Sequence, residues 1–225
     1  MALIPKGSLI VSCQADPGSP FAKPDFICAF AEAAVRSGAA ALRLEGTENV
    51  KAVRHEQSVP IIGLVKKRQR EFGDIYITPT LEDVQALCEA GADIIAFDAT
   101  LRERPVSVER LSQACHELGK VALADISTVA EAEAAMAAGA NLISTTLSGY
   151  TAYSPQLDAP DFELIKALAA KNLQPLAEGR IRTAQEAAQA VECGAYAVVV
   201  GSAITRPGVI ASWFKQALDE MRGRI

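Results

Sequence analysis

The stretch AGADIIAFDAT, Ala90 to Thr100, contains the pattern that decides the fold. A glycine follows a helix-like segment, and a short, continuous apolar run comes next and stops at polar residues. Glycine after a helix accepts the left-handed cap conformation, and a continuous apolar run is typical of a parallel strand covered on both faces. The stretch therefore predicts a helix end, a glycine cap and a buried parallel strand.

The same pattern recurs along the chain as SGAAALRLEG (37–46), AGANLISTTLSG (138–149) and CGAYAVVVGSA (193–203). Apolar runs of this kind predict strands at Leu9–Cys13, Ala40–Leu44, Ile61–Val65, Ile94–Phe97, Val121–Asp125, Leu142–Thr146, Pro175–Glu178 and Ala197–Gly201. Between them, apolar residues fall at helical spacing, as in the final segment from Ile210 to Met221. Strands alternating with helices over 225 residues predict an α/β fold, a single-domain (β/α)₈ TIM barrel, because open doubly wound sheets usually have about six strands.

Two segments lie outside this repeat. Residues 1–7 predict a short leading element before the first strand, without the features of an export signal. Lys66 to Thr80 contains YITPT, which fits an extra strand, but its charged start and Pro79 favour a long loop. Thr80 is expected to cap the next helix, and Thr183 with Glu186 is expected to form a capping box.

Charge and hydropathy exclude several classes of partner. The formal net charge of -5 is spread along the chain in mixed signs, so we expect no binding to nucleic acid or to an anionic membrane surface. No run approaches the roughly 18 apolar residues of a membrane span. We therefore expect a globular protein of the cytoplasm.

Cofactor and metal motifs are also missing from the sequence. The five cysteines are odd in number and never form C-x-x-C, so we expect free thiols. His55 and His116 are far apart, and there is no dinucleotide fingerprint, P-loop or nucleophile elbow. We expect no cofactor and no metal, although acids at the strand ends leave a magnesium site as an alternative.

Polar residues follow most of the predicted strands. Because the carboxyl ends of barrel strands converge on one mouth, these residues can be considered as a set. The set is Gln14, Arg43, Glu45, Lys66, Asp98, Asp125, Thr145, Thr146 and Glu178. Each residue alone fits a solvated loop equally well, but their shared position in the repeat predicts a functional cavity.

Lys66 and Glu178 are the candidate acid and base of this cavity. Lys66 is the first of the two lysines that end PIIGLVKK, and burial would lower its pKa from about 10.4 toward the range of a general base. Strand alternation should turn Lys67 the other way. Glu178 ends a short apolar run and could exchange a proton or bind substrate there. The alternative is that these side chains are simply solvated.

The glycine-bearing turns AEGRI and VVGSAITRP follow the seventh and eighth strands. TIM barrels commonly bind phosphate at these two loops, where glycine lets backbone N–H groups approach the anion. The candidate phosphate-binding residues are Gly179, Arg180, Gly201, Ser202 and Arg206.

Several stretches together resemble the N-acetylmannosamine-6-phosphate 2-epimerases of sialic acid catabolism. They are LIVSCQA, LRLEG, PIIGLVKK, YITPT, FDAT with RERP, ADIST, TTLSGYT, LAEGRI and VVVGSAITRP, and they run from the first predicted strand to the last. The resemblance implies cofactor-independent conversion of N-acetylmannosamine 6-phosphate to N-acetylglucosamine 6-phosphate. It also implies that Lys66 and Glu178 are catalytic and that Gln14, Arg43 and Asp125 bind or orient the sugar. We add Thr146 to the substrate-binding candidates. The segment KKRQREFGD departs from the spacing expected of the family.

Inverting C2 of the ring-opened sugar requires loss of the proton beside a carbonyl and its return on the opposite face, work suited to Lys66 and Glu178. Two other functions remain open at this stage. Lys66 could form a Schiff base in a phosphosugar aldolase, or the barrel could bind a phosphosugar without catalysis. Alanine-rich outer helices also suggest a homodimer.

Overall fold

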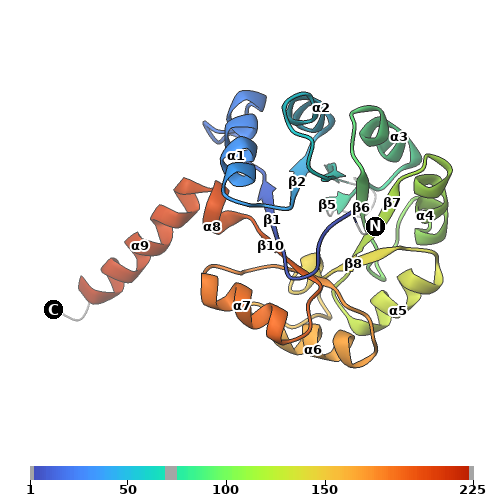
Figure 1. Ribbon diagram of the computed structural model, residues 1–225. Helices are drawn as coiled ribbons and strands as arrows, with labels where there is room; N and C mark the ends of the chain where they lie inside the picture. Colours follow the sequence, from blue (N-terminus) through green and yellow to red (C-terminus); the bar gives the residue numbers. More distant parts are fainter. Residues whose placement is uncertain (1–2, 69–74, 223–225) are drawn as a thin grey trace.

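The computed structural model describes residues 3–68 and 75–222. In this part of the chain, eight parallel strands close into a barrel surrounded by helices (Figure 1). Going around the barrel, the strands are β1 (Leu9–Cys13), β2 (Ala41–Glu45), β3 (Ile61–Leu64), β6 (Ile94–Asp98), β7 (Val121–Asp125), β8 (Leu142–Ser144), β9 (Leu176–Glu178) and β10 (Ala197–Val200). The chain's last strand pairs with its first, so the sheet has no edge. The predicted (β/α)₈ barrel is confirmed.

Helices connect successive strands on the outside of the barrel. They are α1 (Pro24–Arg36), α2 (Thr47–Glu56), α3 (Leu81–Glu89), α4 (Val108–Glu117), α5 (Val129–Ala137), α6 (Phe162–Ala170) and α7 (Ala184–Glu192). A short helix, α8 (Ser202–Thr205), and a longer one, α9 (Pro207–Arg222), follow the last strand. Thr80 and Thr183 both form the capping contacts expected of them, each as part of a full capping box.

Two predicted strands coincide with observed ones, Leu9–Cys13 and Val121–Asp125. The other predicted bounds differ from the observed ones by one or two residues, most of all at Leu142–Thr146: this strand ends at Ser144, and Thr145–Leu147 forms a 3₁₀ turn, η1. The turn forms because the Leu147 amide bonds to the carbonyl of Ile126 on the neighbouring connection instead of extending the sheet. Thr145 and Thr146 therefore sit on a tight turn above β8.

The predicted long loop from Lys66 to Thr80 was wrong. Its described ends form an antiparallel hairpin of β4 (Lys66–Arg68) and β5 (Ile75–Ile77). YITPT does contain strand residues, because Tyr76 and Ile77 are buried and override the charged start of the segment. The tip, residues 69–74, lies outside the described residues.

The interior of the barrel is apolar toward one end and polar toward the other. Inward-facing Ile62, Ile94 and Leu123 belong to one apolar cluster. Two residues beyond Ala41 on β2 and Leu123 on β7, which both belong to this cluster, the inward positions are Arg43 and Asp125. Because side chains alternate along a strand, this change from apolar to polar places the charged groups together at the carboxyl end of the barrel.

The glycines of the recurring pattern adopt the expected conformation. Gly91 has φ 101° and Gly194 has φ 103°, in the left-handed region that follows a helix end. At Gly194 a Cβ would also lie only 2.4 Å from the Cβ of Ala169, so the position has no room for a side chain. The glycine caps predicted from the sequence are confirmed.

The described part of the leading element, residues 3–7, is tied to the barrel. The hydroxyl of Tyr196 donates to the carbonyl of Ile4, and the Gly7 amide donates to the carbonyl of Tyr196 at 2.7 Å. Ile4 is buried. The segment is thus attached where β10 begins.

Helix α9 has a different environment from the other helices. It extends away from the barrel (Figure 1), and none of its described residues is buried. The side chains of Phe214, Leu218 and Met221 are 70%, 63% and 52% exposed. The apolar residues of its C-terminal part, from Phe214 to Met221, therefore do not pack against its own barrel.

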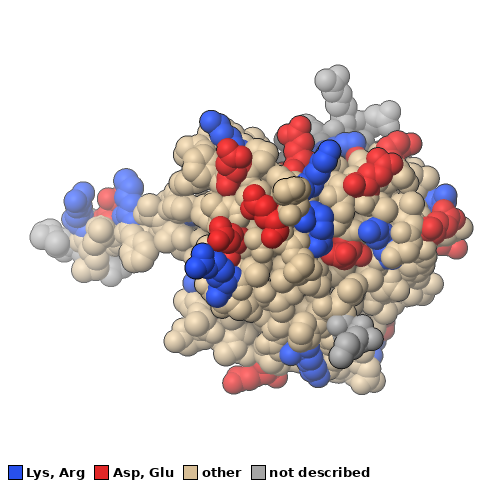
Figure 2. All heavy atoms as spheres, turned by 45° about the horizontal axis from the view of Figure 1, so that its top comes forward, with Lys and Arg blue, Asp and Glu red and all other residues tan. Residues whose placement is uncertain are grey.

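On the face that Figure 2 shows, acidic and basic side chains are interspersed over the surface. Among the described residues, every helix is too short or too polar to cross a membrane. The five cysteines are free thiols. Burial raises the pKa of Cys13 to about 12, so its thiol is a poor nucleophile at neutral pH.

Candidate active site

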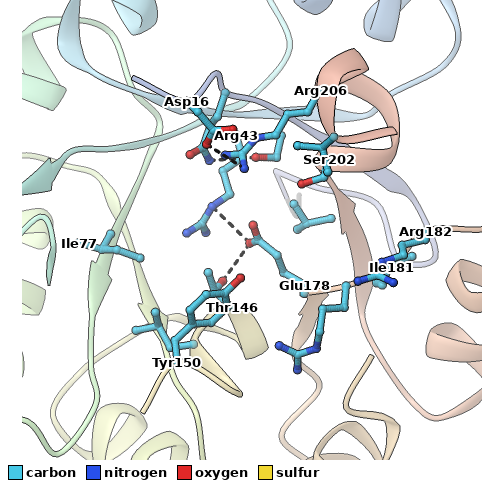
Figure 3. Close-up of a pocket in the computed structure, with 18 of the residues that line it drawn as sticks. Asp16, Arg43, Ile77, Thr146, Tyr150, Glu178, Ile181, Arg182, Ser202 and Arg206 are labelled. Carbon is cyan, nitrogen blue, oxygen red and sulfur yellow. Dashed lines mark hydrogen bonds and ion pairs between the residues drawn. The ribbon is translucent and has the colours of Figure 1, made fainter. Parts of the chain in front are cut away.

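A cavity of about 700 Å³ opens at the carboxyl ends of the strands (Figure 3). Among the described residues that line it, six are cationic and two are acidic: Arg43, Lys66, Arg102, Arg180, Arg182 and Arg206 against Asp16 and Glu178. An excess of cationic groups in a concave site attracts anions. The cavity therefore suits a small, negatively charged ligand.

Lys66 reaches the cavity from the first position of β4. Its amine donates to Gln14 Oε1 at 2.7 Å, and the amide of Gln14 donates in turn to Ser12 Oγ at 2.9 Å. Lys67 turns the opposite way and forms an ion pair with Asp83. The alternation predicted for the two lysines is observed.

The surroundings of Lys66 favour its neutral form. The side chain as a whole is exposed to the cavity, whereas its amine is hydrogen-bonded to Gln14 and has many protein atoms around it. Burial lowers the pKa of Lys66, and the positive charges of Arg206 and Arg43 lower it further, against a smaller opposing effect of Glu45 and Glu178. A larger share of this amine than of an ordinary lysine is therefore available to accept a proton.

The hairpin that carries Lys66 is fixed to the barrel by Thr78. The Thr78 amide donates to the carbonyl of Val65 at 2.8 Å, and its hydroxyl donates to the carbonyl of Ala96 on β6 at 2.6 Å. Thr78 is fully buried. These bonds set the direction in which the chain leaves β3 and so aim Lys66 into the cavity.

Glu178 is held at both its backbone and its side chain. Thr145 Oγ1 donates to the Glu178 carbonyl at 2.9 Å and accepts from the Glu178 amide at 3.0 Å. Glu178 Oε2 accepts from Thr146 Oγ1 at 2.9 Å and lies 3.3 Å from Arg43 Nε. Figure 3 shows these side-chain contacts as dashed lines, with the carboxylate facing the cavity.

Arg43 and Asp125 form a buried ion pair behind Glu178. The guanidinium donates to both oxygens of Asp125, at 3.1 and 2.6 Å, and the two side chains are 1% and 0% exposed. Burial raises the pKa of Asp125 to about 6 against the opposing effect of Arg43. For Arg43, burial alone would lower the pKa, but the charges of Asp125 and Glu178 outweigh it and raise the pKa. The pair is thus ionised at neutral pH.

We expect the variant Arg43→Met to be destabilised by about 3–5 kcal/mol, because it leaves a buried carboxylate without its cation. Urea denaturation would measure the free energy of unfolding. The double variant Arg43→Met with Asp125→Leu should recover most of the loss. Arg36→Met, on an exposed pair with Glu32, should cost less than about 1 kcal/mol. A buried variant no less stable than this surface control would contradict the expectation.

The five candidate phosphate-binding residues all line the cavity: Gly179, Arg180, Gly201, Ser202 and Arg206. Ser202 begins α8 and Arg206 follows its end, and Arg206 Nη1 lies 3.1 Å from Asp16 Oδ1. The side chain of Arg180 is turned onto the chain, where it donates to the carbonyls of Ala159 and Ser148. Both candidate arginines thus have protein partners, a carboxylate for Arg206 and two backbone carbonyls for Arg180.

Four residues of the predicted mouth set are not among the described residues that line the cavity: Glu45, Asp98, Asp125 and Thr145. Asp98 instead forms ion pairs with Arg102 and Arg104 and accepts from the amide and hydroxyl of Thr100. Thr145 acts on the backbone of Glu178. Asp125 lies behind Arg43 and Thr146, so it can influence a ligand only through them.

Sequence reasoning missed several residues of the cavity wall. Arg102 and Arg182 both lie four residues beyond the end of a strand, outside the strand-end positions from which the site was predicted. Trp213 of α9 also lines the cavity, where the guanidinium of Arg182 stacks on its ring at 5.0 Å. The loops after the strands, rather than their last residues alone, hold the additional signal.

A metal site finds no support in the described residues. They contain no cluster of three or more histidine, cysteine, aspartate or glutamate side chains arranged to hold an ion. Glu178 and Asp125 are occupied by Arg43 and Thr146. The partner that both acids share is thus the positively charged Arg43, which would repel a bound metal ion.

The chain matches known proteins over most of its length. The family described as "Putative N-acetylmannosamine-6-phosphate epimerase" matches residues 27–220. A "Putative N-acetylmannosamine-6-phosphate 2-epimerase" of Klebsiella pneumoniae is 50% identical over 212 residues, covering 94% of this chain and 90% of the relative. A relative with the same description from Caldanaerobacter subterraneus is 49% identical over 222 residues, covering 96% of this chain and 93% of the relative.

A solved structure gives the same picture. The N-acetylmannosamine-6-phosphate 2-epimerase from Clostridium perfringens superposes with a TM-score of 0.92 at 41% sequence identity. The match covers 95% of this chain and 94% of that one. The sequence and the fold of this chain are therefore both similar to those of N-acetylmannosamine-6-phosphate epimerases.

Proposed function

This chain belongs to the N-acetylmannosamine-6-phosphate epimerase family, and we propose that it interconverts N-acetylmannosamine 6-phosphate and N-acetylglucosamine 6-phosphate in amino-sugar catabolism. The observation that carries the proposal is that an amine and a carboxylate, Lys66 and Glu178, line one cationic cavity. The reaction needs a proton acceptor and a proton donor at one carbon. It also needs a site for a phosphate.

We assign the proton transfers to Lys66 and Glu178. In the ring-opened sugar, one of them takes the C2 proton, and the electron pair of that bond moves into the enolate. The other group delivers a proton to the opposite face of C2. The lowered pKa of Lys66 supports a role as base, because the neutral amine is the form that accepts a proton.

The positive charge of Arg43 supports stabilisation of the negatively charged enolate. Arg43 lines the cavity with its charge fixed by Asp125, so it offers a permanent positive charge close to Glu178. A fixed cation stabilises negative charge as it develops without having to reorganise. Gln14, Arg43 and Thr146 are the proposed sugar-orienting residues, with Asp125 acting behind them.

The phosphate of the substrate is proposed to bind at the loops after β9 and β10. Gly179, Arg180, Gly201, Ser202 and Arg206 line that side of the cavity. Glycine permits close approach of backbone N–H groups, and Arg206 supplies charge. A sugar phosphate is made and used inside cells, so we also propose a cytoplasmic location.

Incubation with N-acetylmannosamine 6-phosphate in heavy water tests the function. We expect N-acetylglucosamine 6-phosphate carrying deuterium at C2, observed by proton NMR and mass spectrometry. Product without deuterium would exclude deprotonation at C2. Borohydride treatment during turnover should leave the protein unlabelled, whereas a Schiff-base aldolase would be trapped on Lys66. Binding without conversion would support a non-catalytic barrel.

We propose that the protein is a homodimer that uses α9. Phe214, Leu218 and Met221 follow the spacing i, i+4 and i+7, so they form one apolar stripe, and all three are more than half exposed. A stripe of this kind on a soluble protein usually contacts another surface. A second copy of the chain is the partner that is always present.

Light scattering would test this contact. We expect the protein to have about twice the 23.8 kDa mass of one chain, and we expect Phe214→Glu with Leu218→Glu to give single chains because charge in an apolar contact is costly. Lys215→Ala, which removes an exposed charge paired with Asp219 on the same helix, should leave the mass unchanged. Wild-type protein that runs as a single chain at micromolar concentration would refute the proposal.

A further inference from the structure

The hydroxyl of Thr146 lies between two carboxylates. Its Oγ1 is 2.8 Å from Asp125 Oδ1 and 2.9 Å from Glu178 Oε2. The hydroxyl of Ser144 is a third neighbour, at 2.8 Å. Thr146 thus connects the buried acid behind the cavity wall with the acid that faces the cavity.

A hydroxyl has one hydrogen and accepts two hydrogen bonds. Thr146 can therefore donate to only one of the two carboxylates at a time. When Glu178 is ionised, Thr146 can donate to it and accept from Ser144. When Glu178 carries a proton, Glu178 can donate to Thr146, and Thr146 can then turn its own hydrogen to Asp125. Both arrangements leave every hydroxyl and carboxyl hydrogen with an acceptor.

The charged groups around Glu178 are held by other partners, so they are not free to move when Glu178 gains or loses a proton. Arg43 approaches from β2 with its Nε 3.3 Å from Glu178 Oε2, while its other nitrogens are held by Asp125 on β7. Lys66, from β4, is bonded to Gln14. Thr146 needs only to rotate its O–H bond, a motion that costs little.

We propose that Thr146 is a positioning residue whose hydroxyl turns from Glu178 to Asp125 when Glu178 gains a proton, and turns back when Glu178 loses it. The inference rests on the proposed function. In the half-reaction where Glu178 takes the proton, the C2–H bond breaks, its electron pair stays in the enolate, and the new O–H of Glu178 donates to Thr146. In the reverse half-reaction the same bonds form and break in the opposite order.

Thr146→Val keeps the shape of the side chain and removes the hydroxyl. We expect kcat to fall about 10- to 100-fold, the usual cost of a hydrogen bond to a charged group, with KM within about threefold. Thr146→Ser should restore most of kcat.

A buried hydroxyl elsewhere provides the matched control. Ser112 on α4 is buried, and its hydroxyl has no hydrogen-bond partner among the residues that the structure describes. Ser112→Ala should leave kcat and KM unchanged. Thr146→Ala, which relieves any crowding of the valine methyl group, provides a second test if the valine variant does not fold.

The outcomes separate this inference from the proposed function. Wild-type protein without C2 deuteration would reject the function itself. An active wild type with an unaffected Thr146→Val variant would reject only the role of Thr146. A variant with raised KM and unchanged kcat would show that Thr146 contacts the sugar instead. A serine variant as impaired as the valine variant would also overturn the proposal.

Discussion

Lys66→Ala is expected to lower kcat by a factor of about 10² to 10⁴, the usual contribution of a positioned acid or base. The substrate should still bind, because the variant keeps Arg206 and the loops after β9 and β10. Conversion of N-acetylmannosamine 6-phosphate, followed by a coupled assay, gives kcat, and calorimetry gives the dissociation constant. The loss should therefore fall on chemistry and not on affinity.

The neighbouring lysine is a close control for this variant. Lys67 occupies the next position of the same strand, but its amine pairs with Asp83 outside the cavity. Lys67→Ala should keep kcat within about twofold of wild type, because its amine lies outside the cavity and Asp83 keeps its contacts with Thr80. Equal losses in the two variants would show that charge near β4, and not the amine of Lys66, matters. Retained epimerisation in Lys66→Ala would reject the assignment.

Glu178→Gln is expected to lower kcat by a similar factor of about 10² to 10⁴. Glutamine preserves the length of the side chain and its acceptor for Thr146, but it cannot take or deliver a proton. Exchange of the C2 hydrogen in heavy water then shows which of the two epimers Glu178 deprotonates. One epimer should lose exchange at C2 in this variant, while the other continues to exchange through Lys66.

An exposed glutamate provides a control for the loss of one negative charge outside the cavity. Glu163 on α6 is 84% exposed and pairs with Lys166. Glu163→Gln should leave turnover and exchange unchanged. Undiminished exchange of both epimers in Glu178→Gln would remove Glu178 from the proton transfers.

The barrel could be predicted because local signals and the global fold agree. Glycine caps such as Gly91 and the continuous apolar runs each depend on a few neighbouring residues. The hairpin of β4 and β5 could not be predicted in the same way. Its strands pair across residues 69–74, and Tyr76 is buried by contacts with distant segments, such as the carbonyl of Glu103.

The candidate site was predictable as a set of residues but not as a set of contacts. The positions of Lys66, Glu178 and Arg43 near the carboxyl ends of predicted strands place them at one end of the barrel. It cannot show that Arg43 is committed to Asp125, because the two residues are 82 positions apart in the sequence. It also cannot show that Asp98 binds Arg102 and Arg104 instead of facing the cavity. Side-chain partners depend on rotamers and loop paths that no periodicity encodes.

Helix α9 shows a different limit. Its apolar spacing predicted a helix, and the helix is present, but spacing does not say which surface an apolar stripe meets. In the barrel helices the stripe meets the strands. In α9 the stripe from Phe214 to Met221 stays exposed.

The stacking of Arg182 on Trp213 gives the protein an optical reporter of its own. The chain has a single tryptophan, and its ring lies in the wall of the cavity beneath a cation. Indole emission responds to the polarity and charge around the ring. Fluorescence of the unlabelled protein therefore reports from one wall of the cavity, where a bound anion would compete for the guanidinium.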